Sequence, residues 1–585
     1  MKKVIYIITI LITGSFLFLS SCSEEFLETQ PKGTAGGDVM TTPKGVEAML
    51  IGAYDYLDGG RWRAAGASNW VWGSIASDDC HKGESRGHPV PLVQIERYEV
   101  LATNLDVEQK WVAMYDAVSR TNDVLTFLWE TQKKDEKITE ARATEIEAEA
   151  RFLRAWYHFE LTRVFDNICY IMTPEEMDGK TPAEIPNDSP GWDEIEADLQ
   201  FALDNLPYTP PKGEVARPDK YAVMAVKARV HLFQQEFGQA KTLLDEIINS
   251  GEFELVENYD DNFKATTENN KESIYEVQCN VGYGTGENSL VVTGPSAHQR
   301  GPASRGWGFY QPTQNLFNAF QVNSEGLPIL DPGDREDLKN DYAVETSEEF
   351  IPTDHLLDPR VDWTIARRGI PFLDFGIHEG KNWIREQESE GPFMTKKFHH
   401  YLENEGTLTI PSGFSNARNY RPYRYGHVLL WRAEVAVEED DLDYARQLVN
   451  MIRERVQDDF VMGRCDTYIF DGREKLIDWN QPAANYLVEP YPPDAEAFSS
   501  QENARKAVRL EHRLEFATEG LRFFQLKRWG IAEETLNNFL QHPEELRIHS
   551  VLEGANFDPD VDDYMPIPQS QLDLQDALKQ DPGYE

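Results

Sequence analysis

The chain has 585 residues and is strongly acidic, with 57 Lys and Arg against 101 Asp and Glu and a formal net charge of −44. Such a chain repels nucleic-acid phosphates, and no basic stripe offsets the repulsion, so a nucleic-acid-binding role is excluded. A neutral ligand such as a sugar meets no such penalty. The 13 Trp and 24 Tyr supply many flat side chains that combine an apolar ring with a polar group.

The first residues are typical of a bacterial export signal. Lys2 and Lys3 precede an apolar run, residues 4–19, which is shorter than the roughly 20 residues that a membrane-spanning helix needs. The letters LSSC, which end at Cys22, resemble a bacterial lipobox. In a lipobox the cysteine receives diacylglycerol and becomes the new N-terminus after cleavage. We therefore predict a lipoprotein signal peptide over residues 1–21 and lipidation at Cys22.

Hydrophobic residues recur at helical spacing in several long segments beyond the leader. In residues 144–165 they fall three and four positions apart, and a capping-box pattern at residues 144–147 predicts that the helix starts there. Residues 223–247 predict a helical hairpin that breaks at Gly238, and residues 425–456 predict a second one. Units of this kind stack on each other as in tetratricopeptide repeats, because one pair cannot bury its apolar face alone.

Residues 503–519 predict another long helix, which Gly520 ends. Three glutamates share one face of this segment, with three arginines nearby: Glu511, Glu515, Glu519, Arg509, Arg513 and Arg522. A catalytic role for these acids is conceivable from their spacing, but ion pairs on a helix surface are the ordinary interpretation. We therefore expect this segment to be structural.

Three long stretches rich in Gly, Pro and Asn interrupt the helices, at residues 61–93, 280–313 and 371–415. Loops of this length inside a folded domain are usually functional or disordered. Their tryptophans and tyrosines argue against disorder, because disordered segments contain few aromatic residues. We expect these loops to be ordered and to contribute to function.

Four segments resemble the SusD/RagB family. Residues 145–167, EIEAEARFLRAWYHFELTRVFDN, and the hairpin of residues 220–255 are similar to two of its helical elements. Residues 507–530, AVRLEHRLEFATEGLRFFQLKRWG, closely resemble the family's ExRxEFAxEGxRxxDLxRWG box, although Gln525 stands where Asp is common. The end of the chain, residues 564–585, resembles the family's LxPIPxxExxxNPxLxQNPGY finish.

The resemblance implies a surface lipoprotein of Bacteroidota that is anchored in the outer membrane and exposed on the cell surface. The letters SEE directly after Cys22 resemble a surface-display signal, and a solvated tether is the alternative. The implied fold is mainly α, with a tetratricopeptide-like scaffold of helix pairs and long irregular ligand-binding loops. The scaffold would pack on a SusC-like TonB-dependent barrel, and the loops would bind a glycan without catalysis. Some members of the family take a peptide or another nutrient instead.

We expect four regions along the chain, the last two packed as one globular unit. They are the signal peptide (1–21), the lipid anchor and tether (22–40), an N-terminal helical region (41–270) and a C-terminal region (271–585). Two other functions remain open from the residues themselves. One is a helical glycoside hydrolase that uses an Asp/Glu pair on surface-captured polysaccharide. The other is a structural surface protein without a ligand.

Five aromatic residues in the loops are the candidates for contact with a sugar. A sugar ring has an apolar face that matches a flat aromatic side chain and hydroxyls that match Asn, Asp, Gln or Arg. The candidates are Trp62, Trp70, Trp72, Trp307 and Tyr310. Trp62 is the strongest, because flanking arginines and neighbouring glycines indicate an exposed loop. The alternative for each ring is a place in the core.

Signals for metals, cofactors and disulfides are weak. The DxDxD letters at Asp558, Asp560 and Asp562 lack the Gly and Glu of a calcium-binding EF-hand loop, so we interpret them as a solvated acidic loop. We predict no metal site and no cofactor, and leave a structural calcium ion open. For the remaining four cysteines we favour buried free thiols and leave their pairing open: Cys80, Cys169, Cys279 and Cys465.

Overall fold

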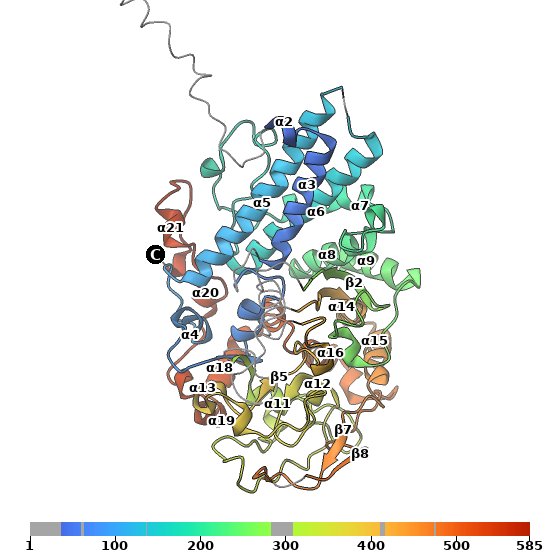
Figure 1. Cartoon of the computed structure of the whole chain (residues 1–585), viewed down its shortest axis with the longest axis vertical. Helices are drawn as coiled ribbons and strands as arrows, with labels where there is room; N and C mark the ends of the chain where they lie inside the picture. Colours follow the sequence, from blue (N-terminus) through green and yellow to red (C-terminus); the bar gives the residue numbers. More distant parts are fainter. Residues whose placement is uncertain are drawn as a thin grey trace, which may run out of the picture.

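The computed structural model describes residues 37–59, 64–135, 137–281, 308–409, 416–472 and 475–584. This part of the chain is mainly α-helical, as predicted (Figure 1). The helices that build the scaffold are α3 (Pro43–Tyr54), α5 (Leu105–Gln132), α6 (Glu140–Phe165), α7 (Trp192–Asn205), α8 (Lys220–Phe233), α9 (Phe237–Ser250), α14 (Tyr425–Glu438), α15 (Leu442–Arg455) and α16 (Gln501–Phe516).

Shorter helices surround this scaffold. They are α2 (Gly37–Met40), α4 (Val90–Glu96), α11 (Gln314–Ala319), α12 (Arg360–Thr364), α13 (Gln387–Glu390), α17 (Arg522–Arg528), α18 (Ala532–Leu540), α19 (Pro543–Ile548), α20 (Pro559–Asp562) and α21 (Gln569–Leu572). A single π-helical turn, η3, spans Trp70–Ile75. Among the described residues, no helix combines the length and the apolar character needed to cross a membrane.

The strands of the described residues are short and form antiparallel pairs that link distant parts of the chain. The pairs are β1 (Cys80–Gly83) with β3 (Phe309–Pro312), β2 (Ser273–Val277) with β6 (Tyr420–Arg424), β4 (Ile365–Ala366) with β5 (Met394–Thr395), and β7 (Met462–Cys465) with β8 (Ile477–Pro482). Three of these pairs fix the long loops to the scaffold or to each other. The β7–β8 pair closes a hairpin at one end of the molecule (Figure 1).

Helices that follow one another in the chain pack side by side. α5 packs on α6, α6 on α7, α7 on α8 and α8 on α9, and α14 continues the row by packing on α9, α15 and α16 (Figure 1). The connections at residues 234–236 and 439–441 are short, which makes α8 and α9, and α14 and α15, antiparallel neighbours. Each pair covers the apolar face of the next. This is the helix-pair scaffold that the sequence predicts.

Helix α6 starts earlier than the capping-box pattern predicts. It begins at Glu140, where the Thr139 side chain accepts a hydrogen bond from the Arg142 amide. Thr144 lies inside the helix and donates to the Glu140 carbonyl at 3.0 Å. Residues 140–144 carry no apolar stripe, but Glu, Ala and Arg are strong helix formers, so propensity extends the helix beyond the periodic pattern.

The two predicted hairpins form, with one change. The second, α14–α15, turns at Asp440 (φ +61°), and the Asp441 side chain caps α15. In the first, the break falls at residues 234–236 and Gln235 takes the positive φ of +59°. The predicted break at Gly238 is wrong, because this glycine lies in the first turn of α9. A non-glycine residue supplies the left-handed turn instead.

Glu511 and Glu515 of α16, and Glu519 just beyond this helix, are buried and not on a helix surface. Glu515 pairs with Arg360 at 3.1 Å, Arg424 at 2.6 Å and Arg455 at 2.6 Å, and the four side chains are at most 4% exposed. Although burial alone would raise the pKa of Glu515, these three guanidinium groups hold it well below its ordinary value. The structural role is as expected, but the partners come from distant segments and not from the same helix.

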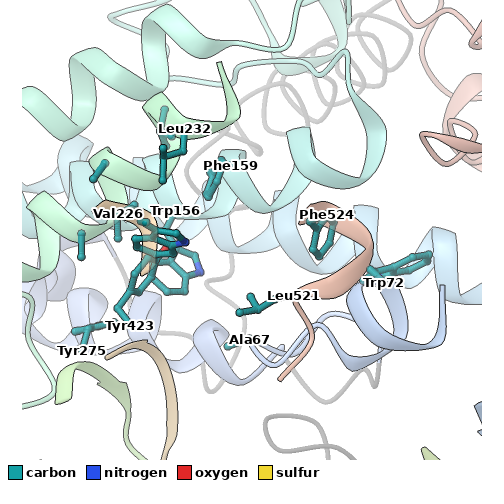
Figure 2. Packing of buried hydrophobic residues seen from close by; sticks show 14 of the residues in the cluster. Ala67, Trp72, Trp156, Phe159, Val226, Leu232, Tyr275, Tyr423, Leu521 and Phe524 are labelled. Atoms are coloured by element: carbon teal, nitrogen blue, oxygen red, sulfur yellow. The ribbon is translucent and has the colours of Figure 1, made fainter. Parts of the chain in front are cut away.

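One large hydrophobic core runs through the helix scaffold, and smaller clusters lie under the middle loops. In Figure 2, Trp156 of α6 lies beside Tyr423 of β6, and their ring centroids are 5.5 Å apart. Trp72 lies near Phe524 of α17 in the same view, where η3 packs against that helix. The loop that contains η3 is therefore part of the core and not an appendage.

Candidate ligand-binding surface

Two of the aromatic candidates, Trp70 and Trp72, lie in η3 and are each 1% exposed. The Trp72 indole donates to the Ala64 carbonyl at 2.5 Å. The Trp70 ring packs on Phe309 and Tyr310, with centroids 6.3 and 5.6 Å away. Both rings are enclosed by protein and present no open face.

Tyr310 is also 1% exposed. Its hydroxyl donates to the Thr518 carbonyl and lies 3.0 Å from the Ser74 hydroxyl. A sugar platform needs an accessible ring face, so the expectation that Trp70, Trp72 and Tyr310 contact a ligand is corrected by their burial. These three side chains fasten η3 and β3 to the segment after α16.

The remaining candidates, Trp62 and Trp307, lie outside the described residues, as does the predicted lipidation site Cys22. The described residues next to the long loops, however, meet in one place. The Cys279 amide donates to the Asn419 side chain at 2.7 Å, and Val277 pairs with Tyr420 between β2 and β6. Two loop-bearing segments therefore have their bases in contact. Asp58, at the base of a third, is near enough that its charge, after burial, helps raise the pKa of the Cys279 thiol to about 12.

We call the meeting point of these bases the loop base. Its side chains are polar, and some of their hydrogen-bonding atoms have no partner among the described residues. Arg418 is 2% exposed, and its Nε and Nη1 atoms have no hydrogen-bond partner among the described residues. Burial lowers the pKa of Arg418 to about 10. Burial also raises the pKa of the neighbouring Glu268 to about 7, although the Asn419 amide donates to it. Arg418 is thus enclosed by protein like Trp70 and Trp72, whereas Glu268 is only partly buried and can still accept a hydrogen bond from a ligand.

A separate, concave feature is a groove of about 650 Å³ along α5, which also involves residues 169–182 and α21. Its floor is apolar and includes Trp111, Tyr115 and Phe127, while Asp116 and Asp123 are exposed at its rim. Tyr115 is fixed by donating to the Cys169 carbonyl at 3.0 Å. A groove of this size with aromatic rings and a few carboxylates matches the usual make-up of a small-ligand site.

One cluster among the described residues has the donor atoms of a metal site. A nitrogen of His231 and carboxylate oxygens of Glu196 and Glu236 lie within 4.8 Å of one another, on α7, α8 and the turn after α8. His231 Nδ1 lies 2.6 Å from Glu236, and Gln234 donates to Glu196, so hydrogen bonds already account for these groups.

The other polar motifs of the sequence have structural roles. Asp558 caps α20 by accepting from the Asp560 amide, and Asp562 accepts from the Asp558 amide at 2.8 Å. The acidic letters therefore form a capped helical turn and not a loop, with Asp558 and Asp560 solvated as expected and Asp562 buried. The four described cysteines are free thiols, as favoured from the sequence: Cys80, Cys169, Cys279 and Cys465.

Sequence reasoning missed the aromatic residue that the described structure exposes most clearly. Trp479, in β8, is 54% exposed, and its neighbours Asp478 and Asn480 are exposed too. The available signal was a tryptophan set among the polar letters DWNQ, outside the glycine-rich loops. Such a pattern is typical of a strand with a solvated face.

Comparison with known proteins shows what the chain is similar to. A family model described as "SusD family" matches residues 271–584, and one described as "Starch-binding associating with outer membrane" matches residues 25–232. SusD-like protein P38 of Formosa agariphila is 27% identical over 547 residues, which cover 90% of this chain and 92% of that protein. A SusD-like protein of Bacteroides ovatus is 24% identical over 281 residues, 46% of this chain and 49% of that protein.

Solved structures share the fold over nearly the whole chain. A SusD-like protein from Bacteroides fragilis superposes with a TM-score of 0.67 at 21% identity, over 94% of this chain and 99% of that one. Surface glycan-binding protein A from Bacteroides thetaiotaomicron, in complex with laminarihexaose, gives a TM-score of 0.63 at 19% identity, over 92% and 99%. At these identities the likeness shows the fold.

Proposed function

The chain belongs to the SusD family, and on this premise we propose that it is a surface-exposed, lipid-anchored outer-membrane protein that binds glycan and delivers it to a SusC-like TonB-dependent transporter. It carries out this role without catalysis. Structural relatives that are named for glycan binding, including one in complex with laminarihexaose, support the ligand class. The family description "Starch-binding associating with outer membrane" supports the location.

The observation that carries the ligand half of the proposal is the loop base at Asp58, Cys279 and Arg418. Long irregular segments that start from one rigid place on a helical scaffold are a common way to build a binding surface. In the sequence, Trp62 follows Asp58 by four positions, and Trp307 lies in the stretch between Cys279 and β3. The partly buried Glu268 carboxyl adds a hydrogen-bonding group there.

The test of ligand binding is native affinity electrophoresis of the mature soluble protein, from Ser23 onward, against a panel of plant, host and microbial polysaccharides. We expect one glycan class to retard migration while no new reducing ends appear in the same samples. Retardation together with steady release of reducing ends would contradict the non-catalytic role and favour the hydrolase. A chain that binds no glycan, either alone or with its barrel partner, would contradict the ligand class.

Three substitutions then locate the surface. Trp62→Ala and Trp307→Ala are expected to weaken retardation, because each removes a flat ring from the loop segments. Phe127→Ala, which alters the floor of the α5 groove, is the comparison. If Phe127→Ala alone weakens binding, the groove takes the glycan and the loop proposal fails.

The anchor and the partner need separate tests in cells. Metabolic labelling with a palmitate analogue should mark the wild-type chain and leave Cys22→Ala unlabelled, because only the thiol accepts the diacylglycerol. Extracellular protease should remove the protein from intact cells if it is surface-exposed. Co-purification of a TonB-dependent barrel encoded in the same locus would support delivery, and repeated purification without one would contradict it.

A further inference from the structure

Trp479 is the tryptophan that the described part of the chain leaves most open to solvent, at 54% exposure. It lies in β8, which pairs with β7 in an antiparallel hairpin. In Figure 1 this hairpin is at the opposite end of the longest axis from α2 and α3. The site is therefore separate from the α5 groove.

The ring of Trp479 has a fixed support. A Cβ atom added to Gly463 would lie 2.8 Å from the ring atom Cζ3 and 2.9 Å from Pro371 Cγ, so the ring packs directly against the glycine backbone beside that proline. Gly463 has a φ of +122° and lies where the β7–β8 register shifts. A side chain at position 463 would displace the ring, and its absence keeps the indole in one orientation. A ring held in this way loses little entropy when a ligand stacks on it.

Hydrogen-bonding groups accompany the ring. Asp478, Asn480 and Gln481 are exposed along β8. Gln481 is two residues from Trp479, in the stretch of β8 that lies opposite Gly463 at the register shift. None of the described residues hydrogen-bonds to the Gln481 side chain. A flat ring with neighbouring amides and a carboxylate matches the face and the hydroxyls of a neutral sugar.

A second copy of the chain is the main competing occupant, since an exposed strand offers unpaired backbone groups. The hairpin discourages this pairing, because a register shift interrupts it and Pro482 ends β8 without an amide hydrogen. An acidic polymer is disfavoured as well, because Asp478 lies next to the ring and the chain carries a net charge of −44.

We propose that Trp479 is a stacking platform for one ring of a neutral polysaccharide, in addition to the surface proposed at the loop base. This inference rests on the proposed glycan-binding function and deepens it. Two sites on one chain raise the apparent affinity for a polymer that reaches both, and leave the affinity for a short oligosaccharide unchanged. The platform would therefore hold a long chain while the loops take its end.

The experiment compares Trp479→Ala and Trp479→Phe with wild type, using the polysaccharide that retards the wild type and a short oligosaccharide of the same glycan. Leu476→Ala is the control, because Leu476 is 67% exposed next to the same hairpin but is not flat. We expect Trp479→Ala to weaken polysaccharide binding roughly three- to tenfold and to leave oligosaccharide binding unchanged. Trp479→Phe should retain most of the binding, and Leu476→Ala should match wild type.

A second readout follows the ring directly. N-bromosuccinimide oxidises accessible indoles, and peptide mapping by mass spectrometry identifies which ones. Trp479 should be oxidised before the buried Trp70 and Trp72, and saturating polysaccharide should slow its oxidation.

If the wild type binds glycan while Trp479→Ala binds equally well and Trp479 gains no protection, the platform is overturned and the proposed function stands. If the wild type binds no glycan, the proposed platform and the proposed glycan-binding function are both contradicted. A change of oligomeric state in Trp479→Ala without a change in glycan binding would assign the face to a second copy.

Discussion

Gly73 and Gly520, 447 positions apart in numbering, pack backbone against backbone. A Cβ at Gly73 would lie 1.8 Å from the Gly520 carbonyl oxygen, and a Cβ at Gly520 would lie 1.7 Å from the Ser68 carbonyl oxygen. Gly520 also has a φ of +72° and donates its amide to the Ser74 hydroxyl. This contact joins η3 to the segment between α16 and α17, so the glycine of the family box is required by packing and by backbone conformation.

Substitution of either glycine is therefore expected to destabilise the fold. Gly73→Ala and Gly520→Ala should each lower the free energy of unfolding by about 3 kcal/mol or more, because rigid backbone must move to admit the methyl group. Urea denaturation followed by circular dichroism measures the change. Gly238→Ala is the control, since nothing lies within 4 Å of its added Cβ. That variant should gain up to about 1 kcal/mol from higher helix propensity.

The buried ion network predicts a large cost for removing a single charge. Glu515→Ala should lower the free energy of unfolding by roughly 3 to 5 kcal/mol, because Arg360, Arg424 and Arg455 would lose their shared partner in the core. Lys271→Ala is the matched surface control, since Lys271 and Glu254 are 45% and 70% exposed. Its expected change is below about 1 kcal/mol. Equal effects of the two substitutions in urea denaturation would contradict the assigned role of burial.

Asp341 predicts a specific dependence of stability on pH. Burial raises its pKa from 3.8 to about 7, and Arg368 opposes the rise only in part. The folded state binds this proton more tightly than the unfolded chain. The contribution to stability is therefore fully present below pH 3.8 and is lost as the pH rises to about 7. The loss amounts to roughly 4 kcal/mol at most.

Asp341→Asn removes this titration while keeping the shape of the side chain. Its stability relative to wild type should increase from pH 4 to pH 7 and level off above that range, as measured by thermal or urea unfolding at each pH. Asp354→Asn, at a side chain that is 99% exposed, should leave the wild-type profile unchanged. A parallel profile for Asp341→Asn would show that Asp341 ionises normally in the folded protein.

The buried aromatic residues predict an effect on stability and none on binding. Tyr310→Phe should cost about 1 to 2 kcal/mol, because the Thr518 carbonyl loses its donor in the core. Trp72→Ala should cost about 3 to 5 kcal/mol by leaving a large cavity. Affinity for the glycan, measured on the folded fraction, should match wild type for both. A loss of affinity with unchanged stability would return these residues to the ligand site.

The thiols predict a simple chemical result. Burial is the largest cause of a raised pKa at each of the four thiols. It raises the pKa of Cys169 and Cys279 to about 12 and that of Cys465 to about 11. The pKa of Cys80 is raised well above its ordinary value. Soluble protein from Ser23 onward should react slowly with Ellman's reagent when folded, because the reagent needs an accessible thiolate. In urea without reductant, four thiols should titrate. A smaller number would reveal a disulfide.

The helix pairs and the fold class could be predicted from the sequence because their signals are local. The apolar spacing in α14 and α15 repeats every three or four residues, and the turn between them contains Asp441, which caps the second helix. The family box at residues 507–530 also follows from letters that lie next to one another. The helix boundaries do not follow from the periodic pattern alone, since α6 extends by propensity beyond it.

The exposure of each aromatic ring and the partners of each buried charge were decided by the tertiary structure. Trp70 and Trp479 both sit among polar and small residues in the sequence, yet one is 1% and the other 54% exposed. The difference comes from Tyr310 and Thr518, which lie hundreds of residues from η3 and close over it. Glu515 likewise takes its arginines from α12, β6 and α15. Sequence spacing determines which side chains share a face of an element, but the packing of distant elements determines whether that face meets solvent.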